Sequence, residues 1–361
     1  MAFRTALAFL SALCAFGISL GAQAQIAPAA APQQFAQMGD LQLENKSTIR
    51  NCAIGYRTLG TLNADRSNAV VFLMWHTGKS EEALSMFGAK GLFDPAPYYV
   101  VIIDAIGNGV SCSPSNSKAQ HDTAFPAFTV RDMVASQHRL LTEKLGLQHV
   151  HAVMGYSMGG MQTFQWMVSH PDFMDVAIPI AGTPRQSSYD MLFWRSLELT
   201  LLNEPSYAKG RYKKQPSMAA LQTVLMMNAT TPEFRVTHTA PQDFEKFFRE
   251  SAARDPEAAD ANDWRWQTQA MLAQDVGDPS DIGKAERSLA VAAAKVKARV
   301  HIISPRQDHI VNPLAALEFA QLLKADTTVL TVLEGNCGHG AVNCEMAKVR
   351  PVVEAALQAT R

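Results

Sequence analysis

A serine lies between glycines in GYSMGG, residues 155–160. The string follows the apolar run HVHAVM and precedes MQTFQWMVSH, which has the composition of a helix. Gly-x-Ser-x-Gly at a strand-to-helix turn projects a serine hydroxyl as a nucleophile, and so sharp a turn leaves no room for side chains two residues before and after the serine. We therefore predict that Ser157 is a nucleophile. The alternative is an ordinary tight glycine turn.

A serine hydroxyl needs a base to take its proton, and the base needs an orienting carboxylate. Asp308 comes just after the apolar run RVHIIS, and His339 just after the last such run, TTVLTVLEG. The order Ser, Asp, His is the one that accompanies this turn. We predict Asp308 as the carboxylate and His339 as the base. His309 and Glu334 are weaker candidates, because His309 precedes the last predicted strand and Glu334 lies before the loop that carries His339.

Acyl transfer also needs N–H donors for the developing oxyanion. The backbone N–H of Met158, directly after the nucleophile, is the first predicted donor. The second is expected from the turn HTGKS, residues 76–80, with Thr77 as first choice and Gly78 as second. His76 either shapes this turn or caps the strand before it.

These residues need a sheet to hold them. Six short apolar runs recur along the chain, at 69–75, 98–104, 149–155, 175–182, 299–304 and 327–335. Continuous rather than alternating apolar runs are expected of parallel strands covered on both faces. Helical patterns lie between them, the clearest at 129–146, where Thr129 and Asp132 form a capping pair and Gly146 ends the helix. The alternation predicts a doubly wound α/β fold, with a mostly parallel sheet between helices.

The strand signal vanishes between residues 185 and 285, where helix-like segments are separated by Pro, Asn and Gly. We predict an inserted helical lid over the sheet's carboxyl edge, dividing the core into 41–184 and 286–361. Some of the lid's apolar residues should roof a substrate pocket, and the candidates follow. They are Met191, Phe193, Trp194, Met226, Met227, Trp264 and Trp266.

The first residues have the pattern of a secretory signal peptide. Arg4 is followed by an apolar run and by the small-residue ending Ala22-Gln23-Ala24. Because the run is shorter than a membrane span of about 20 residues, we predict cleavage after residue 24 rather than a membrane anchor. Residues 25–40 are predicted to be a flexible lead-in. The net charge of −1 does not suggest a nucleic-acid partner.

Cleavage would leave four cysteines in an oxidising compartment, which we expect to be the periplasm: Cys52, Cys112, Cys337 and Cys344. We favour a Cys337–Cys344 disulfide, which would restrain the segment carrying His339. A Cys52–Cys112 bridge is the weaker prediction. The cysteine spacing predicts no zinc site, and the glycine-rich stretch 104–114 lacks a phosphate-binding motif. No metal or organic cofactor is therefore expected.

Several stretches resemble the α/β-hydrolase superfamily and, within it, the homoserine O-acetyltransferase-like branch. They are YRTLGTLNADRSNAVVFLMWHTG, FTVRDMVASQHRLLTEKLG, MGYSMGGMQTFQWMVSHPD and NDWRWQTQAMLAQDVGD. The resemblance implies an α/β-hydrolase fold with triad roles for Ser157, Asp308 and His339 and a lid at 185–285. Two features depart from the acetyltransferases. Gly340 stands where the branch usually has Asp, and PSMAALQTVLMMN lacks the arginine expected to face a homoserine carboxylate.

The sequence thus predicts a secreted serine hydrolase that cleaves a small-molecule carboxylic ester through an acyl-serine. An acyltransferase that uses the same acyl-serine is the first alternative. A catalytically silent binding protein is the second. The sequence leaves a homodimer open.

Overall fold

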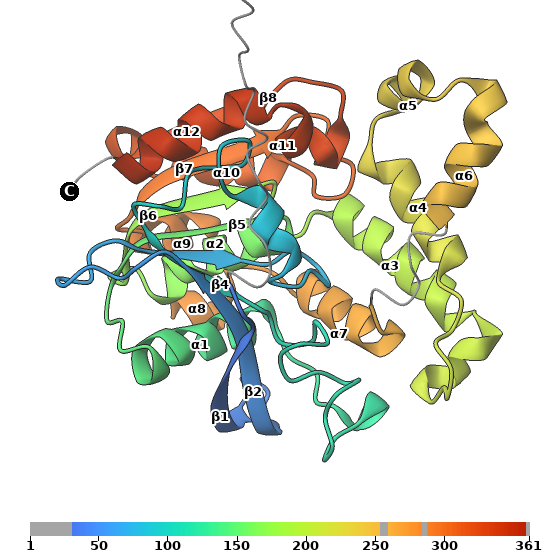
Figure 1. Cartoon of the computed structure of the whole chain (residues 1–361), viewed down its shortest axis with the longest axis horizontal. Helices are drawn as coiled ribbons and strands as arrows, with labels where there is room; N and C mark the ends of the chain where they lie inside the picture. Colours follow the sequence, from blue (N-terminus) through green and yellow to red (C-terminus); the bar gives the residue numbers. More distant parts are fainter. Residues whose placement is uncertain (1–30, 253–258, 284–286, 359–361) are drawn as a thin grey trace, which may run out of the picture.

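The computed structural model describes residues 31–252, 259–283 and 287–358. At its centre lies an eight-stranded sheet with the order β1-β2-β4-β3-β5-β6-β7-β8 (Figure 1). The strands are β1 Gln34–Gln42, β2 Thr48–Leu59, β3 Ala69–Leu73, β4 Tyr99–Ile103, β5 Val150–Tyr156, β6 Met174–Ile180, β7 Arg299–Pro305 and β8 Thr328–Leu333. β1 and β2 pair antiparallel, as do β2 and β4, whereas β3 to β8 run parallel.

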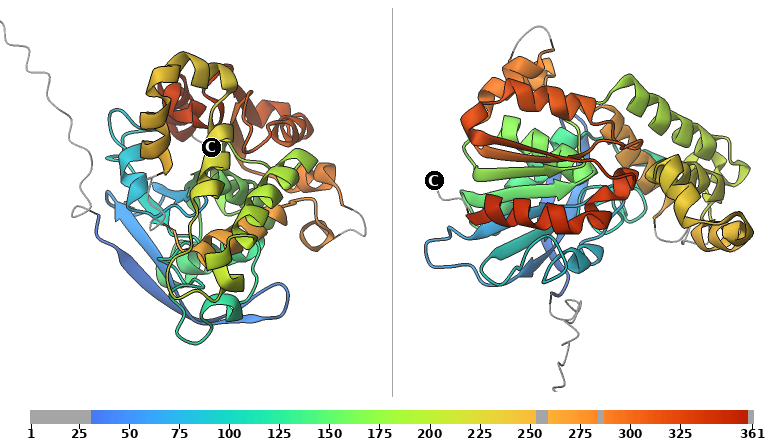
Figure 2. Two further views of the ribbon diagram at one scale, coloured as in Figure 1. Left: turned by 90° about the vertical axis from the view of Figure 1, so that its right-hand side faces the viewer. Right: turned by 90° about the horizontal axis from the view of Figure 1, so that it is seen from above.

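The six predicted apolar runs are the parallel strands, which confirms the expected mostly parallel sheet. β3 is buried along its whole length and β5 along most of it, because helices cover both faces. The helices outside the lid are α1 Val130–Arg139, α2 Met158–Ser169, α9 Leu289–Lys295, α10 Leu314–Leu322, α11 Ala341–Cys344 and α12 Met346–Gln358. Figure 2 shows the sheet between these layers, with the helices of residues 188–252 gathered at one end of it.

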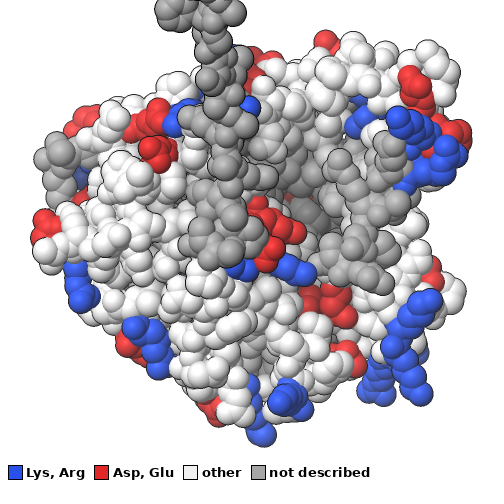
Figure 3. Space-filling model, viewed as in Figure 1, with Lys and Arg blue, Asp and Glu red and all other residues white. Residues whose placement is uncertain are grey.

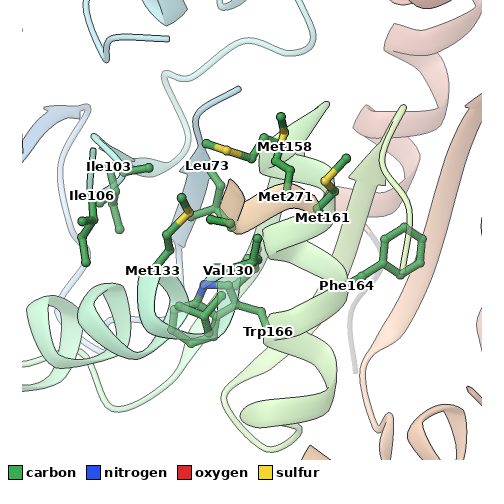
Figure 4. Packing of buried hydrophobic residues seen from close by; sticks show 14 of the residues in the cluster. Leu73, Ile103, Ile106, Val130, Met133, Met158, Met161, Phe164, Trp166 and Met271 are labelled. Carbon is green, nitrogen blue, oxygen red and sulfur yellow. The ribbon is translucent and has the colours of Figure 1, made fainter. Parts of the chain in front are cut away.

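The larger core cluster joins one face of the sheet to α1, α2, α9 and α10. In Figure 4, Leu73 and Ile103 of the strands meet Met133 of α1 and Met161 and Trp166 of α2. The indole of Trp166 is fully buried, and its Nε1–H donates to Gln137 Oε1 at 2.9 Å. This contact joins α2, the helix that follows Ser157, to α1 on the same face of the sheet.

The predicted capping pair is present at the start of α1. Thr129 accepts from the Asp132 N–H, and the Asp132 side chain accepts from the Thr129 N–H. After α1 the chain makes a π-helical turn, Leu140–Lys144, and Gly146 then adopts φ 66°. A left-handed residue is the usual way to end a helix, and glycine adopts this conformation without steric penalty.

The described part of the segment predicted as a lid consists of helices joined by loops. Its helices are α3 Ser188–Leu202, α4 Ala219–Ala229, α5 Pro232–His238, α6 Phe244–Ala252, α7 Ala261–Leu272 and α8 Pro279–Ile282. α7 is buried on most of its surface, whereas α4 buries only Leu221 and α5 buries none of its residues. The lid therefore has an inner part against the core and an outer part facing solvent (Figure 1).

One domain boundary needs correction. The flexible lead-in predicted for 25–40 is wrong over residues 34–40, which belong to β1. β1 pairs with β2 at the sheet edge, and its residues alternate between buried and exposed. Polar residues on the exposed face concealed this strand from a search for continuous apolar runs. The predicted signal peptide, residues 1–24, lies outside the described residues.

Both proposed cysteine pairs are bonded in the structure, Cys52 to Cys112 and Cys337 to Cys344. Lys, Arg, Asp and Glu side chains are interspersed over the face shown in Figure 3, in keeping with the near-zero net charge. Within the described residues, no helix combines the length and apolar character needed to cross a bilayer.

Candidate active site

Ser157 stands at the turn between β5 and α2, with φ 58° and ψ −119°. The turn is possible because its flanking glycines touch backbone. A Cβ on Gly155 would lie 2.5 Å from the Gly159 backbone, and a Cβ on Gly159 would lie 2.0 Å from the Leu73 carbonyl oxygen. A non-glycine residue at positive φ is strained, and such strain gathers at functional sites where the surroundings hold it in place. The geometry is that of the nucleophile elbow predicted from the sequence.

Asp308 and His339 lie beside this serine although they are distant in the chain. The His339 Nε2 is 2.9 Å from the Ser157 Oγ, and the His339 Nδ1 is 2.6 Å from the Asp308 Oδ2. The exposed fractions of Ser157, Asp308 and His339 are only 6%, 2% and 9%. With Nδ1–H donating to the carboxylate, the unprotonated Nε2 can accept the serine hydroxyl proton.

The carboxylate and the imidazole are each held by a second contact. The Asp308 Oδ1 accepts the N–H groups of Ile310 and Val311, both at 2.9 Å. The Tyr156 hydroxyl donates to the His339 carbonyl at 2.8 Å, and the two rings stack with centroids 5.2 Å apart. Burial raises the pKa of Tyr156, so its hydroxyl remains a donor throughout the neutral range. Sequence reasoning did not assign Tyr156 a role, although it lies inside the elbow motif.

Glu334, the weaker candidate for the orienting carboxylate, is paired with a residue other than His339. Glu334 is an exposed side chain in an ion pair with Arg306, with the Arg306 Nε 2.9 Å from a Glu334 oxygen. This pair lowers the pKa of Glu334, as expected of a surface ion pair. Glu334 therefore keeps the strand-end position that the sequence suggested for it.

A cavity of about 550 Å³ opens over Ser157 and His339. Core and lid both contribute to its wall. The lining residues are Trp75, His76, Thr77, Tyr156, Ser157, Trp194, Met218, Gln222, Leu225, Ala229, Ala259, Trp264, Ile310 and His339. Of the described residues in this wall, none is Asp, Glu, Lys or Arg. Mostly apolar walls with a few convergent polar groups are typical of small-molecule sites.

Trp194 and Trp264 line the cavity, as the lid prediction expected of some lid residues. Met227, another predicted candidate, is instead 72% exposed and does not line it. The rest of the lid's described share of the wall comes from Met218, which precedes α4, from Gln222, Leu225 and Ala229 of α4, and from Ala259.

The predicted second oxyanion donor is already engaged. The Thr77 N–H donates to the Gln267 Oε1 at 2.7 Å, so it is not free to meet an oxyanion in this structure. Sequence reasoning could not foresee this contact, because Gln267 is 190 residues away on α7. The N–H groups of His76 and Met158 have no acceptor among the described residues.

His76 joins the turn after β3 to the lid. Its Nε2 lies 3.0 Å from the Trp264 carbonyl and 3.1 Å from the Thr268 Oγ1, and its ring packs edge-on against Trp194 and Trp264. Burial lowers the pKa of His76 to about 4, so the ring is neutral at physiological pH and its Nε2–H donates to the carbonyl. His76 therefore shapes this turn, one of the two alternatives left open by the sequence.

Two further lid contacts reach the loops that carry the acid and the histidine. The Asp190 Oδ1 on α3 accepts the Asn312 N–H at 2.8 Å, four residues after Asp308. The Thr231 hydroxyl donates to the Asn336 carbonyl at 2.5 Å, three residues before His339. Asp190 and Thr231 are both buried. The only sequence signal for Asp190 is the capping pattern Ser187-x-x-Asp190, which marks a helix start rather than a site.

No cluster of three or more His, Cys, Asp or Glu side chains able to hold a metal occurs within the described ranges. The reaction that Ser157, His339 and Asp308 can perform, acyl transfer to and from a serine, needs no such group.

Residues 89–342 match the family model of the alpha/beta hydrolase fold. The chain belongs to the α/β-hydrolase family. The fold agrees with this match, which runs from before β4 into α11.

The relatives of this chain are named both as esterases and as acyltransferases. A probable esterase of Corynebacterium glutamicum is 36% identical over 191 residues, covering 52% of this chain and 55% of that protein, so the match spans about half of each. The ethyl acetate hydrolase of Pseudomonas veronii is 28% identical over 87% of this chain and 92% of its own length. The homoserine O-acetyltransferase of Geotalea daltonii is 29% identical over 87% of this chain and 94% of its own length.

Among solved structures, an acetylester hydrolase from Corynebacterium glutamicum superposes with a TM-score of 0.81 at 26% identity, covering 91% of this chain and 96% of that one. The resemblance to the homoserine O-acetyltransferase-like branch is thus confirmed, and the chain is an α/β-hydrolase family enzyme.

Proposed function

We propose that this protein is a serine esterase that hydrolyses a small, uncharged carboxylic ester through an acyl-enzyme on Ser157. The observation that carries the proposal is the continuous chain of hydrogen bonds from Ser157 through His339 to Asp308 at the floor of an apolar cavity. Similarity to proteins named ethyl acetate hydrolase and acetylester hydrolase supports an ester with a short acyl group.

In the first half-reaction, the Ser157 Oγ attacks the ester carbonyl carbon while its proton passes to the His339 Nε2. Asp308 holds the imidazole in the required tautomer and stabilises the imidazolium. Collapse of the tetrahedral intermediate breaks the bond to the alcohol oxygen, which takes the proton from His339. In the second half-reaction, water attacks the acyl carbon and gives its proton to His339. Ser157 recovers a proton from His339 as the carboxylic acid leaves.

The oxyanion of each tetrahedral intermediate is proposed to meet two backbone donors. Met158 N–H follows the nucleophile at the amino end of α2, where the helix dipole also favours negative charge. The second donor is the His76 N–H rather than that of Thr77, because Thr77 is engaged by Gln267. His76 lines the same cavity as Ser157.

The wall of the cavity favours hydrolysis over transfer to an amino acid. An amino-acid acceptor carries a carboxylate and an ammonium group, and burying either without a charged partner is unfavourable. The described lining residues offer no such partner, and Gly340 follows His339 in the chain. A neutral ester with a small acyl group can bind between these walls without burying an unpaired charge. Water, which is also uncharged, can act as the second substrate.

We further propose that the protein is secreted into an oxidising compartment. The pattern of residues 1–24 supports a signal peptide, and two disulfides are expected where thiols are not kept reduced.

The test is to incubate the protein with p-nitrophenyl esters of increasing acyl length, with and without homoserine, and to measure free acid and acylated acceptor separately. We expect acetate or propionate esters to be the preferred substrates, free acid to be the main product, and Ser157→Ala to be inactive. Dominant acyl transfer to homoserine at modest concentration would favour the acyltransferase alternative. Undiminished turnover by Ser157→Ala would contradict both.

A further inference from the structure

We infer that Gln267 is a positioning residue for catalysis: it holds the Thr77 peptide turned away from Ser157 and thereby presents the His76 N–H to the oxyanion. This inference rests on the proposed esterase function. It assigns a residue of the lid to the reaction although that residue touches neither the nucleophile nor the base.

The amide of Gln267 bridges two loops of the core. Its Oε1 accepts the Thr77 N–H at 2.7 Å, and its Nε2 donates to the Ile106 carbonyl at 2.9 Å. Its side chain is fully buried, with an exposed fraction of 0%. A buried amide is stable only where its polar atoms are paired, so this one is restricted to a single orientation.

The Gln267 side chain is closely packed against the loop after β4. A Cβ placed on Gly107 would lie 3.1 Å from the Gln267 Cγ and 2.6 Å from the Phe128 ring. Gly107 has φ 85°, a conformation suited to glycine. The loop after β4 therefore passes close enough to α7 for its carbonyl at Ile106 to accept the Gln267 amide.

The backbone of Thr77 needs a restraint such as the one that Gln267 provides. It has φ 57°, which is unfavourable for a β-branched side chain. A strained peptide persists only where its surroundings over-determine it. The bond from Thr77 N–H to Gln267 supplies that restraint and sets the direction of the peptide between His76 and Thr77.

A second tether comes from the same face of the same helix. The His76 ring donates to the Trp264 carbonyl at 3.0 Å, and Trp264 precedes Gln267 by three residues, about one helical turn. The side chain of His76 and the peptide that follows it are thus both fixed to α7. Any shift of α7 would move the His76 N–H relative to Ser157.

The opposite role for the same contact makes a different prediction. If the Thr77 N–H were the true oxyanion donor, Gln267 would compete with the oxyanion and would be inhibitory. Removing its amide would then leave activity unchanged or raise it. The two roles therefore predict effects of opposite sign for one substitution.

The experiment compares Gln267→Met, which keeps the side chain's length but removes both hydrogen bonds, with the wild-type full chain on p-nitrophenyl acetate. We expect kcat to fall by roughly 10- to 100-fold with little change in KM, because an oxyanion donor acts on the transition state rather than on the bound ester. Affinity for a trifluoromethyl ketone, which forms a tetrahedral adduct with the serine, should fall by a similar factor. Gln269→Met on the same helix is the control, because Gln269 bonds Glu198 and not the loops of the site.

Gln267→Glu gives a readout that loss of packing would not produce. A protonated carboxyl can accept from Thr77 and donate to the Ile106 carbonyl, whereas an ionised one repels that carbonyl. We therefore expect the ratio of mutant to wild-type kcat to fall as the pH rises through the pKa of the introduced carboxyl. Thermal unfolding of each variant shows whether it is folded.

Equal or higher kcat in folded Gln267→Met would overturn the inference, and so would a pH-independent ratio for Gln267→Glu. If the wild-type protein is active, either result leaves the esterase proposal intact. An inactive wild type, by contrast, would remove the proposed function itself.

Discussion

The inner and outer parts of the lid differ in what they bury. The inner helix α7 buries polar side chains such as Gln267 and Thr268, and α3 buries Asp190. The outer helices α4, α5 and α6 bury few residues in the described part, and Met227 and Val236 there are 72% and 76% exposed. Figure 1 shows the same division, with α7 beside the core and α5 and α6 on the far side of the lid.

Buried polar contacts have fixed geometry, whereas an apolar wall can repack around different ligands. The inner lid uses such polar contacts to hold the loops bearing His76 and Asp308. The outer lid contributes α4 side chains to the wall of the cavity, although Thr231, which caps α5, also bonds the Asn336 carbonyl in the loop that carries His339. We therefore expect inner-lid substitutions to change kcat and outer-lid substitutions to change substrate preference.

The largest effects are expected from His339 and Asp308 in the core, and the effects of the lid variants are compared with them. His339→Ala should lower kcat by several orders of magnitude, because it removes the proposed base. Asp308→Asn should lower kcat by about ten thousand-fold, because an amide at that position favours the wrong tautomer of His339. Steady-state kinetics on p-nitrophenyl acetate measures both effects, and circular dichroism verifies the fold. A loss in either variant no larger than that in the inner-lid variants would refute the triad roles.

Asp190→Ala probes the inner lid through the loop that carries Asp308. The change removes the acceptor for the Asn312 N–H and the capping partner of Ser187. We expect kcat to fall by roughly tenfold and the free energy of unfolding to fall by about 1–2 kcal/mol.

Asp278→Ala is the matched control for this change. Asp278 caps α8, and its side chain contacts Ser280, Arg287 and Arg131 rather than a loop of the site. Its removal should reduce stability without reducing kcat. If the two variants lose kcat equally, the inner lid acts only through stability and the comparison fails.

Leu225→Ala probes the outer lid. Leu225 lines the cavity, and its truncation should enlarge the pocket. We expect the ratio of kcat/KM between long-chain and short-chain esters to change by roughly tenfold, since a methylene or two in an apolar pocket has effects of this size. Met227→Ala, two residues away and exposed, should leave the ratio unchanged. Unaltered selectivity in both variants would show that α4 does not contact the substrate.

The smallest effect on kcat is expected from the disulfides. Comparing the two bridges separates this effect from the loss of stability that both removals should cause. Cys52 and Cys112 are 60 residues apart, and their loss should reduce the free energy of unfolding by about 4 kcal/mol in the chain-entropy model. Cys337 and Cys344 are 7 residues apart, and their loss should reduce it by about 2.5 kcal/mol. Only the second pair encloses His339, so only its double Ser variant should lower kcat, by a few-fold. Denaturant unfolding and kinetics on both double variants test this.

The parallel sheet and the elbow were predictable because they depend on local patterns. Apolar runs such as 69–75 are buried on both faces, and the glycines at 155 and 159 are required by contacts within one turn. The order of the strand-end loops predicted that Asp308 and His339 lie near Ser157, and the structure places them there. The sequence could not reveal β1, whose alternating pattern reflects an edge strand with one solvated face.

The engagement of Thr77 by Gln267 was also beyond prediction from the sequence. It depends on how α7 docks on the core, which brings together residues 190 positions apart. The same is true of Asp190 and Asn312, separated by 122 positions. Local patterns place residues on elements, but contacts between elements follow from packing.

The acyl-enzyme itself is the most direct test of the proposed mechanism. The protein is mixed with p-nitrophenyl acetate, quenched rapidly with acid, digested and analysed by mass spectrometry. We predict an acetyl group on the peptide containing Ser157, formed during turnover and absent from Ser157→Ala. Acetylation of a different residue during turnover, or sustained turnover with no acylated Ser157, would contradict the mechanism.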